Sequence, residues 1–426
     1  MKLNLFKGKE AKNAGWIIGG KIVQMLFSLV VGILTARYLG PGNYGLISYG
    51  AAYISFFSAL CTLGLNSIIV KELIDKPDEQ GTTLGSAIIL RLLSSALSSV
   101  MIIGIVAIVD RDEPLTIAVV ALSTLGLVFH VFEIINFWFQ AQYKSKITSI
   151  ATLIAYIIMS AYKLVILYLG KDVKWFAVAT AVDYIVIAIF LLIAYKMYKG
   201  QAFGFSFARS KSLLKSSYHY ILSSMMVAIY GQTDKLMLKQ MLNETEVGYY
   251  STASAVCGMW VFVLQAIIDS MYPTILRLYS KDEEEYKRKN RQLYAIVFYV
   301  SVIVSVLFLI FGNLVIKILY GEEFMDASGP LKIVTWYTAF SYLGVARNAW
   351  IVSEGKQKYL KYIYAVAAGL NVVLNLIFIP IWGASGAAFA SLVTQVFTSI
   401  ILPMCIKDLR PNAKLMIEAI AFRKIK

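Results

Sequence analysis

Long apolar stretches, separated by short polar ones, cover almost the whole chain. Hydropathy predicts twelve segments, each long enough to cross a bilayer as a helix of about 20 residues. They span residues 15–37, 44–66, 83–109, 115–140, 147–169, 174–196, 217–239, 248–275, 293–316, 331–353, 359–380 and 383–406. The 426 residues are 59% hydrophobic and 15% charged, whereas soluble domains are about 25% charged. The pattern predicts an all-α polytopic membrane protein and excludes a soluble globular class.

The 40 lysines and arginines lie mostly on one side of these segments. The termini and the loops on their side hold 28 of them, the opposite loops hold seven, and five lie inside the segments. Because cytoplasmic loops are enriched in Lys and Arg, we expect a multi-pass protein of the cell (inner or plasma) membrane with both termini in the cytoplasm. The net charge of +15 then reflects orientation and contact with membrane lipid, and nucleic acid is not an expected partner.

Residue usage argues against metal and disulfide chemistry. The three cysteines, Cys61, Cys257 and Cys405, are far apart and form no C-x-x-C pair, and His130 and His219 are the only histidines in the sequence. We therefore expect no metal site, no bound cofactor and no catalytic residues.

A weak internal repeat relates the two halves of the chain. The stretch from Trp138 to Lys146 matches the stretch from Trp350 to Lys358 at an offset of 212 residues. Two parallel six-helix halves are a transporter architecture with the site at their interface. We predict lobes at 1–198 and 217–426, the second with a basic cytoplasmic tail, joined by a basic linker at 199–216. This linker is either an amphipathic helix on the inner leaflet or a solvated segment.

Nine ionisable residues interrupt the apolar segments. The cations are Lys21, Arg91, Lys163, Lys235 and Arg347, and the acids are Glu133, Asp183, Asp234 and Asp269. Each costs roughly 2.5–3.5 kcal/mol at the centre of a bilayer on insertion scales, so together they predict a wet or protein-lined interior. The alternatives are snorkelling of the cations to the headgroups and neutralisation of the cations by the acids.

Polar residues also recur at helical spacing. Lys21, Gln24 and Ser28 share one helix face, Arg91 lies four residues before Ser95, and Asn371 lies four residues before Asn375. Such stripes on several helices predict a shared central polar cavity, although hydrogen bonds between helices produce the same pattern.

Several motifs resemble one family over nearly the whole chain. They are Leu34-Thr-Ala-Arg-Tyr-Leu-Gly-Pro-Gly-Asn-Tyr-Gly-Leu46, Leu63-Gly-Leu65 before Lys71-Glu72, Asp234-Lys-Leu-Met-Leu238, Glu246-Val-Gly-Tyr-Tyr-Ser251, Glu354-Gly-Lys356 and Gly383-Ala-Ser-Gly-Ala-Ala388. These stretches resemble the Wzx-type flippases of polysaccharide repeat units, such as O-antigen and capsule units, in the multidrug/oligosaccharidyl-lipid/polysaccharide exporter superfamily.

The resemblance implies two six-helix lobes around a cation-lined central cavity. It implies transfer of an undecaprenyl-diphosphate-linked oligosaccharide from the cytoplasmic to the outer leaflet by alternating access, for surface polysaccharide or lipopolysaccharide biosynthesis. The five cations would bind the diphosphate, and the four acids would couple H⁺ or Na⁺ or balance charge. Sugar-contacting or cavity-lining polar residues would be Gln24, Ser28, Ser95, Asn371 and Asn375. A polysaccharide polymerase and glycosyltransferases would be partners.

Two other functions remain open. An ion-coupled multidrug antiporter of the same superfamily would favour an acidic cavity, whereas this chain has five cations against four acids. A polytopic polysaccharide polymerase or ligase would need a long external loop, whereas the longest one here has about 16 residues between Ile316 and Leu331. We therefore expect a transporter rather than an enzyme.

Overall fold

The computed structural model describes residues 9–423, and within them all side chains except those of residues 9–18, 20–23, 26, 222 and 223. All regular secondary structure in this range is helical, which confirms the predicted all-α class. Eight helical stretches in it are long and apolar enough to cross a membrane. Helices occupy each of the predicted segments in order, an arrangement consistent with twelve crossings of a polytopic membrane protein.

Two glycine kinks divide the longest helices. Helix α1 (Lys9–Thr62) contains the first two predicted segments, and α13 (Leu360–Val396) contains the eleventh and part of the twelfth. Gly40 has φ +69° and Gly383 has φ +56°, a left-handed backbone that residues with a side chain rarely adopt. Each kink lets two short helices follow one another without a loop.

Two predicted segments are interrupted in the structure. The segment 115–140 consists of α4 (Pro114–His130), a 3₁₀ turn η3 (Val131–Ile134) and α5 (Ile135–Ala141). The segment 248–275 consists of α9 (Glu244–Gly258) and α10 (Val261–Leu278). Hydropathy averages over such breaks because the residues on both sides are equally apolar.

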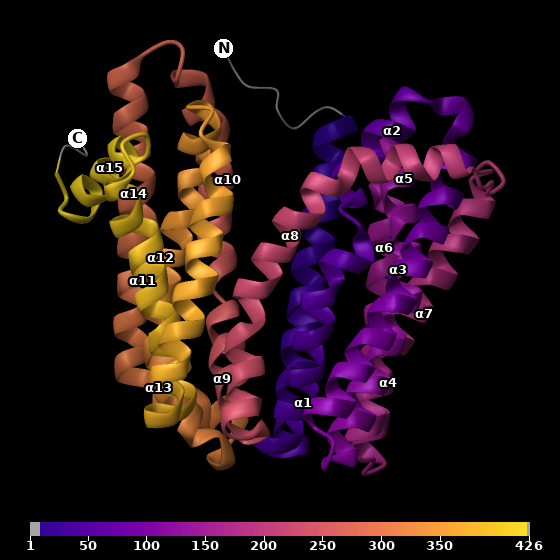
Figure 1. Ribbon diagram of the computed structural model, residues 1–426, viewed down its shortest axis with the longest axis horizontal. Helices are drawn as coiled ribbons and strands as arrows, with labels where there is room; N and C mark the ends of the chain where they lie inside the picture. Colours follow the sequence, from indigo (N-terminus) through magenta and orange to yellow (C-terminus); the bar gives the residue numbers. More distant parts are fainter. Residues whose placement is uncertain (1–8, 424–426) are drawn as a thin grey trace. The chain divides into compact units, whose positions relative to one another are not determined.

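The helices form two units by their internal contacts, and unit 1 comprises Met1–Leu39 and Leu46–Ala228. After α1 it contains η1 (Leu65–Ser67), α2 (Ile69–Asp75), η2 (Pro77–Glu79), α3 (Gln80–Val109), α4, η3, α5, α6 (Ser145–Tyr168) and α7 (Val173–Met197). Helix α4 packs against α3 and α7, and α6 packs against α7 (Figure 1). One apolar core, which includes Leu65, Val131 and Phe139, joins η1, η3 and α5 to α3.

Helix α3 shows how this unit suits a membrane. Leu93, Leu97 and Val100 are 66%, 62% and 69% exposed, whereas Arg91 and Ser95 on the opposite face are buried. A water-soluble helix would show the reverse distribution. The apolar face therefore suits lipid, and the polar face lies inside the unit.

The range predicted as a linker, 199–216, contains an irregular stretch followed by the start of a helix. Residues 200–206 form no helix, and α8 (Phe207–Met241) begins within the range expected to be a separate linker. Arg209 is buried, forms an ion pair with Glu72 at 2.9 Å and donates to the Thr83 hydroxyl at 3.0 Å. The first part of α8 therefore belongs to unit 1, and the division between the units falls at Ala228 rather than in the linker.

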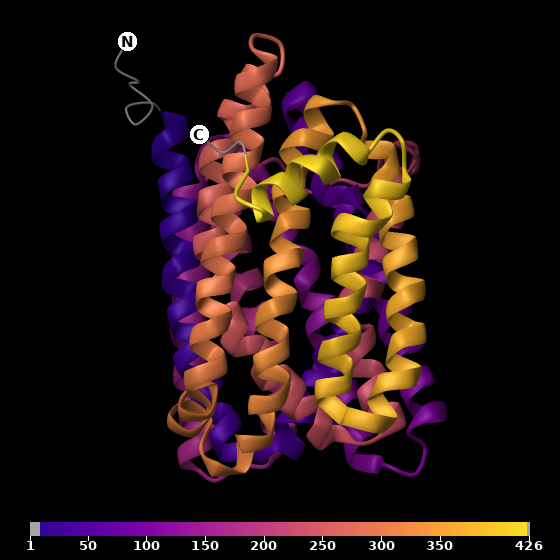
Figure 2. The same cartoon turned by 90° about the vertical axis from the view of Figure 1, so that its left-hand side faces the viewer.

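Unit 2 comprises Gly40–Gly45 and Ile229–Lys426. It contains the rest of α8, then α9, α10, α11 (Glu283–Tyr320), η4 (Glu322–Ala327), α12 (Ser328–Ser353), η5 (Gln357–Tyr359), α13, a π-turn η6 (Phe397–Ile401), α14 (Leu402–Cys405) and α15 (Arg410–Ile420). Helices α11, α12 and α13 lie side by side, and α15 crosses one end of the unit (Figure 2). The short segment Gly40–Gly45 packs here, where Tyr44 contacts the ring of Phe324.

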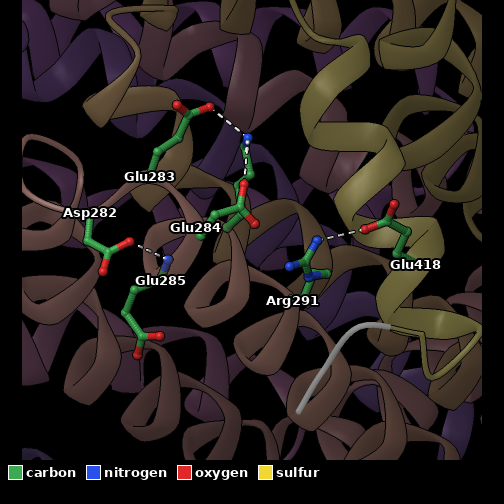
Figure 3. Close-up of polar contacts among 7 residues, drawn as sticks. Asp282, Glu283, Glu284, Glu285, Arg291 and Glu418 are labelled. Carbon is green, nitrogen blue, oxygen red and sulfur yellow. Dashed lines mark hydrogen bonds and ion pairs between the residues drawn. The ribbon is translucent and has the colours of Figure 1, made fainter.

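Polar and charged side chains connect α15 to α11 at one end of unit 2. Asp282 caps α11 by accepting the amide hydrogen of Glu285 at 2.9 Å, and Arg291 forms an ion pair with Glu418 of α15 at 2.9 Å (Figure 3). Asn412 of α15 donates to the hydroxyl of Tyr294 at 2.7 Å in the interior. The basic tail is therefore tied to α11 by specific contacts along α15.

Candidate functional site

A buried arginine lies at the centre of the polar residues of unit 1. Arg91 of α3 is 1% exposed. Its Nη1 is 3.5 Å from Oδ1 of Asn66, and its Nη2 is 3.5 Å from Nδ1 of His130. Its Nε has no hydrogen-bond acceptor, and no carboxylate among the described residues forms an ion pair with it. The guanidinium has five N–H donors but only two hydrogen-bond contacts among the described residues, both long. Its remaining donors could therefore bind an anion.

The 3₁₀ turn η3 brings a histidine and an acid together beside Arg91. Residues three apart eclipse one another in a 3₁₀ turn, and Nε2 of His130 lies 3.0 Å from Oε2 of Glu133. The edge of the Tyr184 ring packs on the His130 ring with centroids 4.8 Å apart. Arg91, His130 and Glu133 therefore form a continuous row, with the histidine in the middle.

A second group of polar residues in unit 1 lies on α1, α6 and α7. Gln24 donates to the hydroxyl of Tyr156. Lys163 and Glu133 both lie within electrostatic range of Asp183, whose Oδ1 is buried without a hydrogen-bond partner. One predicted cation, Lys163, and two predicted acids, Glu133 and Asp183, thus lie near each other inside unit 1.

The other three predicted residues of unit 1, Ser95, Ser28 and Lys21, differ in their surroundings. Ser95 is fully buried and its hydroxyl has no hydrogen-bond partner, whereas Ser28 is exposed. The side chain of Lys21 lies outside the described residues.

A buried carboxylate organises the polar interior of unit 2. Asp234 of α8 is 6% exposed. Its oxygens accept hydrogen bonds from Nδ2 of Asn371 at 3.1 Å, Nδ2 of Asn375 at 2.7 Å, Oγ of Ser391 at 2.6 Å and the hydroxyl of Tyr250. The two predicted asparagines thus meet at one predicted acid.

This network, which we call the Asp234 cluster (Asp234, Tyr250, Asn371, Asn375 and Ser391), has one unused acceptor. The Oδ1 of Asn375 is buried and accepts no hydrogen bond. Lys235 lies within electrostatic range of Asp234 but forms no ion pair among the described residues. The cluster therefore presents oxygen atoms without a neutralising lysine or arginine in contact.

Two further predicted residues of unit 2 have different surroundings. Arg347 is 4% exposed, its Nη1 donates to the carbonyl oxygen of Thr398 at 3.3 Å, and its Nε has no acceptor. It lies on α12 among the buried residues Leu343 and Ala346. Asp269 of α10 is exposed and accepts a hydrogen bond from Gln265 at 2.8 Å. Arg347 thus resembles Arg91 in its incomplete hydrogen bonding, whereas Asp269 is not part of the buried polar interior.

The sequence did not identify four residues that complete these groups. Asn66 and His130 contact Arg91, and Tyr250 and Ser391 contact Asp234. The spacing of His130 and Glu133 was a signal, because they lie three positions apart in an apolar segment. Asn66 and Tyr250 had no such signal, since each lies near the end of a segment where polar residues are ordinary.

Known proteins resemble this chain in both sequence and fold. The capsular polysaccharide biosynthesis protein CapF of Staphylococcus aureus is 20% identical to this chain. The match covers 90% of this chain and 96% of CapF. AglR of Haloferax volcanii, described as a probable flippase, is 21% identical over 95% of this chain and 85% of its own length. The structure of the lipid II flippase MurJ, in an inward closed conformation, matches 96% of this chain and 90% of its own with a TM-score of 0.67 at 14% identity.

Two family profiles match the chain. One, described as MatE, matches residues 220–377. The other matches residues 11–279, which is more than half of the chain, and is described as polysaccharide biosynthesis protein. These matches agree with the resemblance to polysaccharide flippases that the motifs indicated. The chain belongs to the polysaccharide biosynthesis protein family of multi-pass membrane proteins.

Proposed function

We propose that this protein flips undecaprenyl-diphosphate-linked oligosaccharide repeat units from the cytoplasmic to the outer leaflet of the cell membrane by alternating access. Flipping of lipid-linked glycans is supported by the family and by the names of the relatives. The excess of cations on the side of the termini supports a cytoplasmic location for both ends. A polysaccharide polymerase and glycosyltransferases are the partners that such a pathway requires.

The incomplete hydrogen bonding of Arg91 carries this proposal. A buried guanidinium without an ion-pair partner is costly, and an anionic ligand would offset that cost. Phosphate oxygens accept paired hydrogen bonds from arginine at about 2.7–2.9 Å, much shorter than the 3.5 Å contacts observed. We assign the diphosphate to Arg91, and propose that Lys21, Lys163, Lys235 and Arg347 bind it at other stages of transport.

Export of repeat units in a strain lacking the gene tests the proposal. The deletion strain should accumulate lipid-linked repeat units on the cytoplasmic leaflet, and the wild-type gene should restore export. Arg91→Gln should fail to restore it at normal protein level, because Gln has neither the charge nor the paired donors. Arg111→Gln is the matched control, since this cation of unit 1 is exposed, with its side chain 78% accessible. Full export by Arg91→Gln would refute the role of Arg91.

We further propose that the Asp234 cluster is the site of H⁺ or Na⁺ coupling. Sodium is a hard cation that takes oxygen ligands, as Ca²⁺ and Mg²⁺ do. A carboxylate oxygen of Asp234, the unused Oδ1 of Asn375 and the Oγ of Ser391 would supply them. No lysine or arginine of the described part of the chain forms an ion pair with the carboxylate, which supports this assignment because such a partner would compete with the cation.

A pair of acid-to-amide variants tests the coupling site. Asp234→Asn should abolish the dependence of transport on a sodium or proton gradient, because the amide cannot carry the charge that binds either ion. Asp269→Asn is the matched control in the same unit, since Asp269 is exposed. If the ion dependence of transport survives in Asp234→Asn, the coupling site lies elsewhere.

A further inference from the structure

We propose that His130 couples proton uptake to the binding of the diphosphate by Arg91. The neutral imidazole faces the guanidinium, and it takes up a proton when the guanidinium turns to the anion. The inference rests on the proposed role of Arg91. Its experiment separates the two, because binding of the diphosphate and uptake of the proton are measured independently.

Donor and acceptor chemistry fixes the state of His130 in this structure. A guanidinium has only donors, so the Nδ1 of His130 that faces Arg91 Nη2 at 3.5 Å must be an acceptor without hydrogen. The proton of the neutral ring is then on Nε2, which donates to the Glu133 carboxylate at 3.0 Å. An imidazolium would carry a hydrogen on both nitrogens and would oppose the donors of Arg91. The neutral tautomer with its hydrogen on Nε2 thus suits both contacts of His130.

Binding of an anion removes this restriction. When Arg91 directs its donors to a phosphate oxygen, Nδ1 of His130 loses its donor and becomes free to bind a proton. The new imidazolium keeps its hydrogen bond to Glu133, which becomes charge-assisted and stronger. The negative charge of the diphosphate also favours a second cation nearby. Each diphosphate bound is thus accompanied by up to one proton, which is released when Arg91 returns to His130.

Among the described residues, Arg91 is the only cation in contact with His130, and Lys163 of α6 lies within electrostatic range of Asp183. The described titratable groups near it are Arg91 of α3, Glu133 of η3, Tyr184 and Asp183 of α7 and, near Arg91, Cys61 of α1. Apart from Arg91, these groups are acids, a phenol and a thiol. Histidine is the side chain that ordinarily changes charge between pH 5 and 8.

Calorimetry with a soluble prenyl diphosphate tests the inference. Farnesyl diphosphate is titrated into the purified full-length protein in detergent, in buffers of different ionisation enthalpy, from about pH 6 to about pH 8. The wild type should take up close to one proton per diphosphate. Its affinity should be about 100-fold higher at the acid end, whereas His130→Gln should lack this part of the pH dependence. Glutamine can accept from Arg91 and donate to Glu133 as the neutral ring does, but it cannot take up the proton.

The second histidine of the sequence supplies the matched control. His219 of α8 is exposed, and His219→Gln should behave as the wild type does. Equal proton uptake by His130→Gln and the wild type would overturn the inference and leave diphosphate binding intact. If the wild type does not bind farnesyl diphosphate, or if Arg91→Gln binds it equally well, the assignment of the diphosphate to Arg91 fails and the inference fails with it.

Discussion

Replacing Arg91 by methionine should stabilise the protein while it abolishes transport. Methionine keeps much of the volume of arginine but removes the buried charge. The two contacts of Arg91 at 3.5 Å are at the outer limit of hydrogen bonding and contribute little to stability. The Nε without an acceptor costs about 1–3 kcal/mol, so Arg91→Met should stabilise unit 1 by about that amount. For a unit of this size the rise in Tm is about 2–10 °C.

Thermal unfolding followed with a thiol-reactive fluorophore measures the change in the Tm of unit 1. Cys61 is buried in unit 1, Cys257 is buried in unit 2, and Cys405 is exposed. With Cys257→Ala and Cys405→Ser in the background, the signal reports only the exposure of Cys61. The comparison then isolates unit 1 from the rest of the chain.

Arg209→Met is the matched control because Arg209 is a buried arginine of unit 1 with an ion-pair partner. Its guanidinium lies 2.9 Å from the carboxylate of Glu72, so its loss should destabilise unit 1 by roughly 1–3 kcal/mol. If Arg91→Met lowers the Tm as Arg209→Met does, Arg91 is a structural residue and the reasoning from its unsatisfied donors is refuted.

Three other substitutions test separate parts of unit 2. Gly248→Ala should lower the yield of folded protein, because a Cβ there would lie 2.1 Å from the carbonyl oxygen of Pro41; normal yield and Tm would contradict this close packing. Tyr250→Phe removes one hydrogen-bond donor to Asp234. It should lower the free energy of unfolding by about 1 kcal/mol and weaken the dependence of transport on the ion gradient. Unchanged ion dependence would place the coupling site elsewhere. Burial raises the pKa of Glu354, so stability from this group is lost as pH rises through that pKa. Glu354→Gln should therefore raise the Tm at neutral pH and leave it unchanged in acid, and equal shifts at both pH values would contradict this.

The hydrophobic pattern was sufficient for the class of fold because a bilayer imposes one length on every crossing helix. Backbone groups in lipid must bond within the helix, so an apolar run of about 20 residues has few alternatives. The pattern could not place the break between α9 and α10 or the 3₁₀ turn η3. Those depend on local backbone geometry that apolar side chains do not encode.

The sequence by itself also determined which residues are costly in a membrane, because charge inside an apolar segment is visible without coordinates. It named Arg91 and Asp234 for this reason, but it could not distinguish them from Asp269, which the structure places on an exposed face. Only the tertiary structure decided that Arg91 forms no ion pair with a described carboxylate and that Asp234 has four donors. The physical reason is that the partners of a buried charge come from helices distant in sequence, whose rotations are set by packing. His130 acquires its proposed role in this way, since its contact with Arg91 joins residues 39 positions apart.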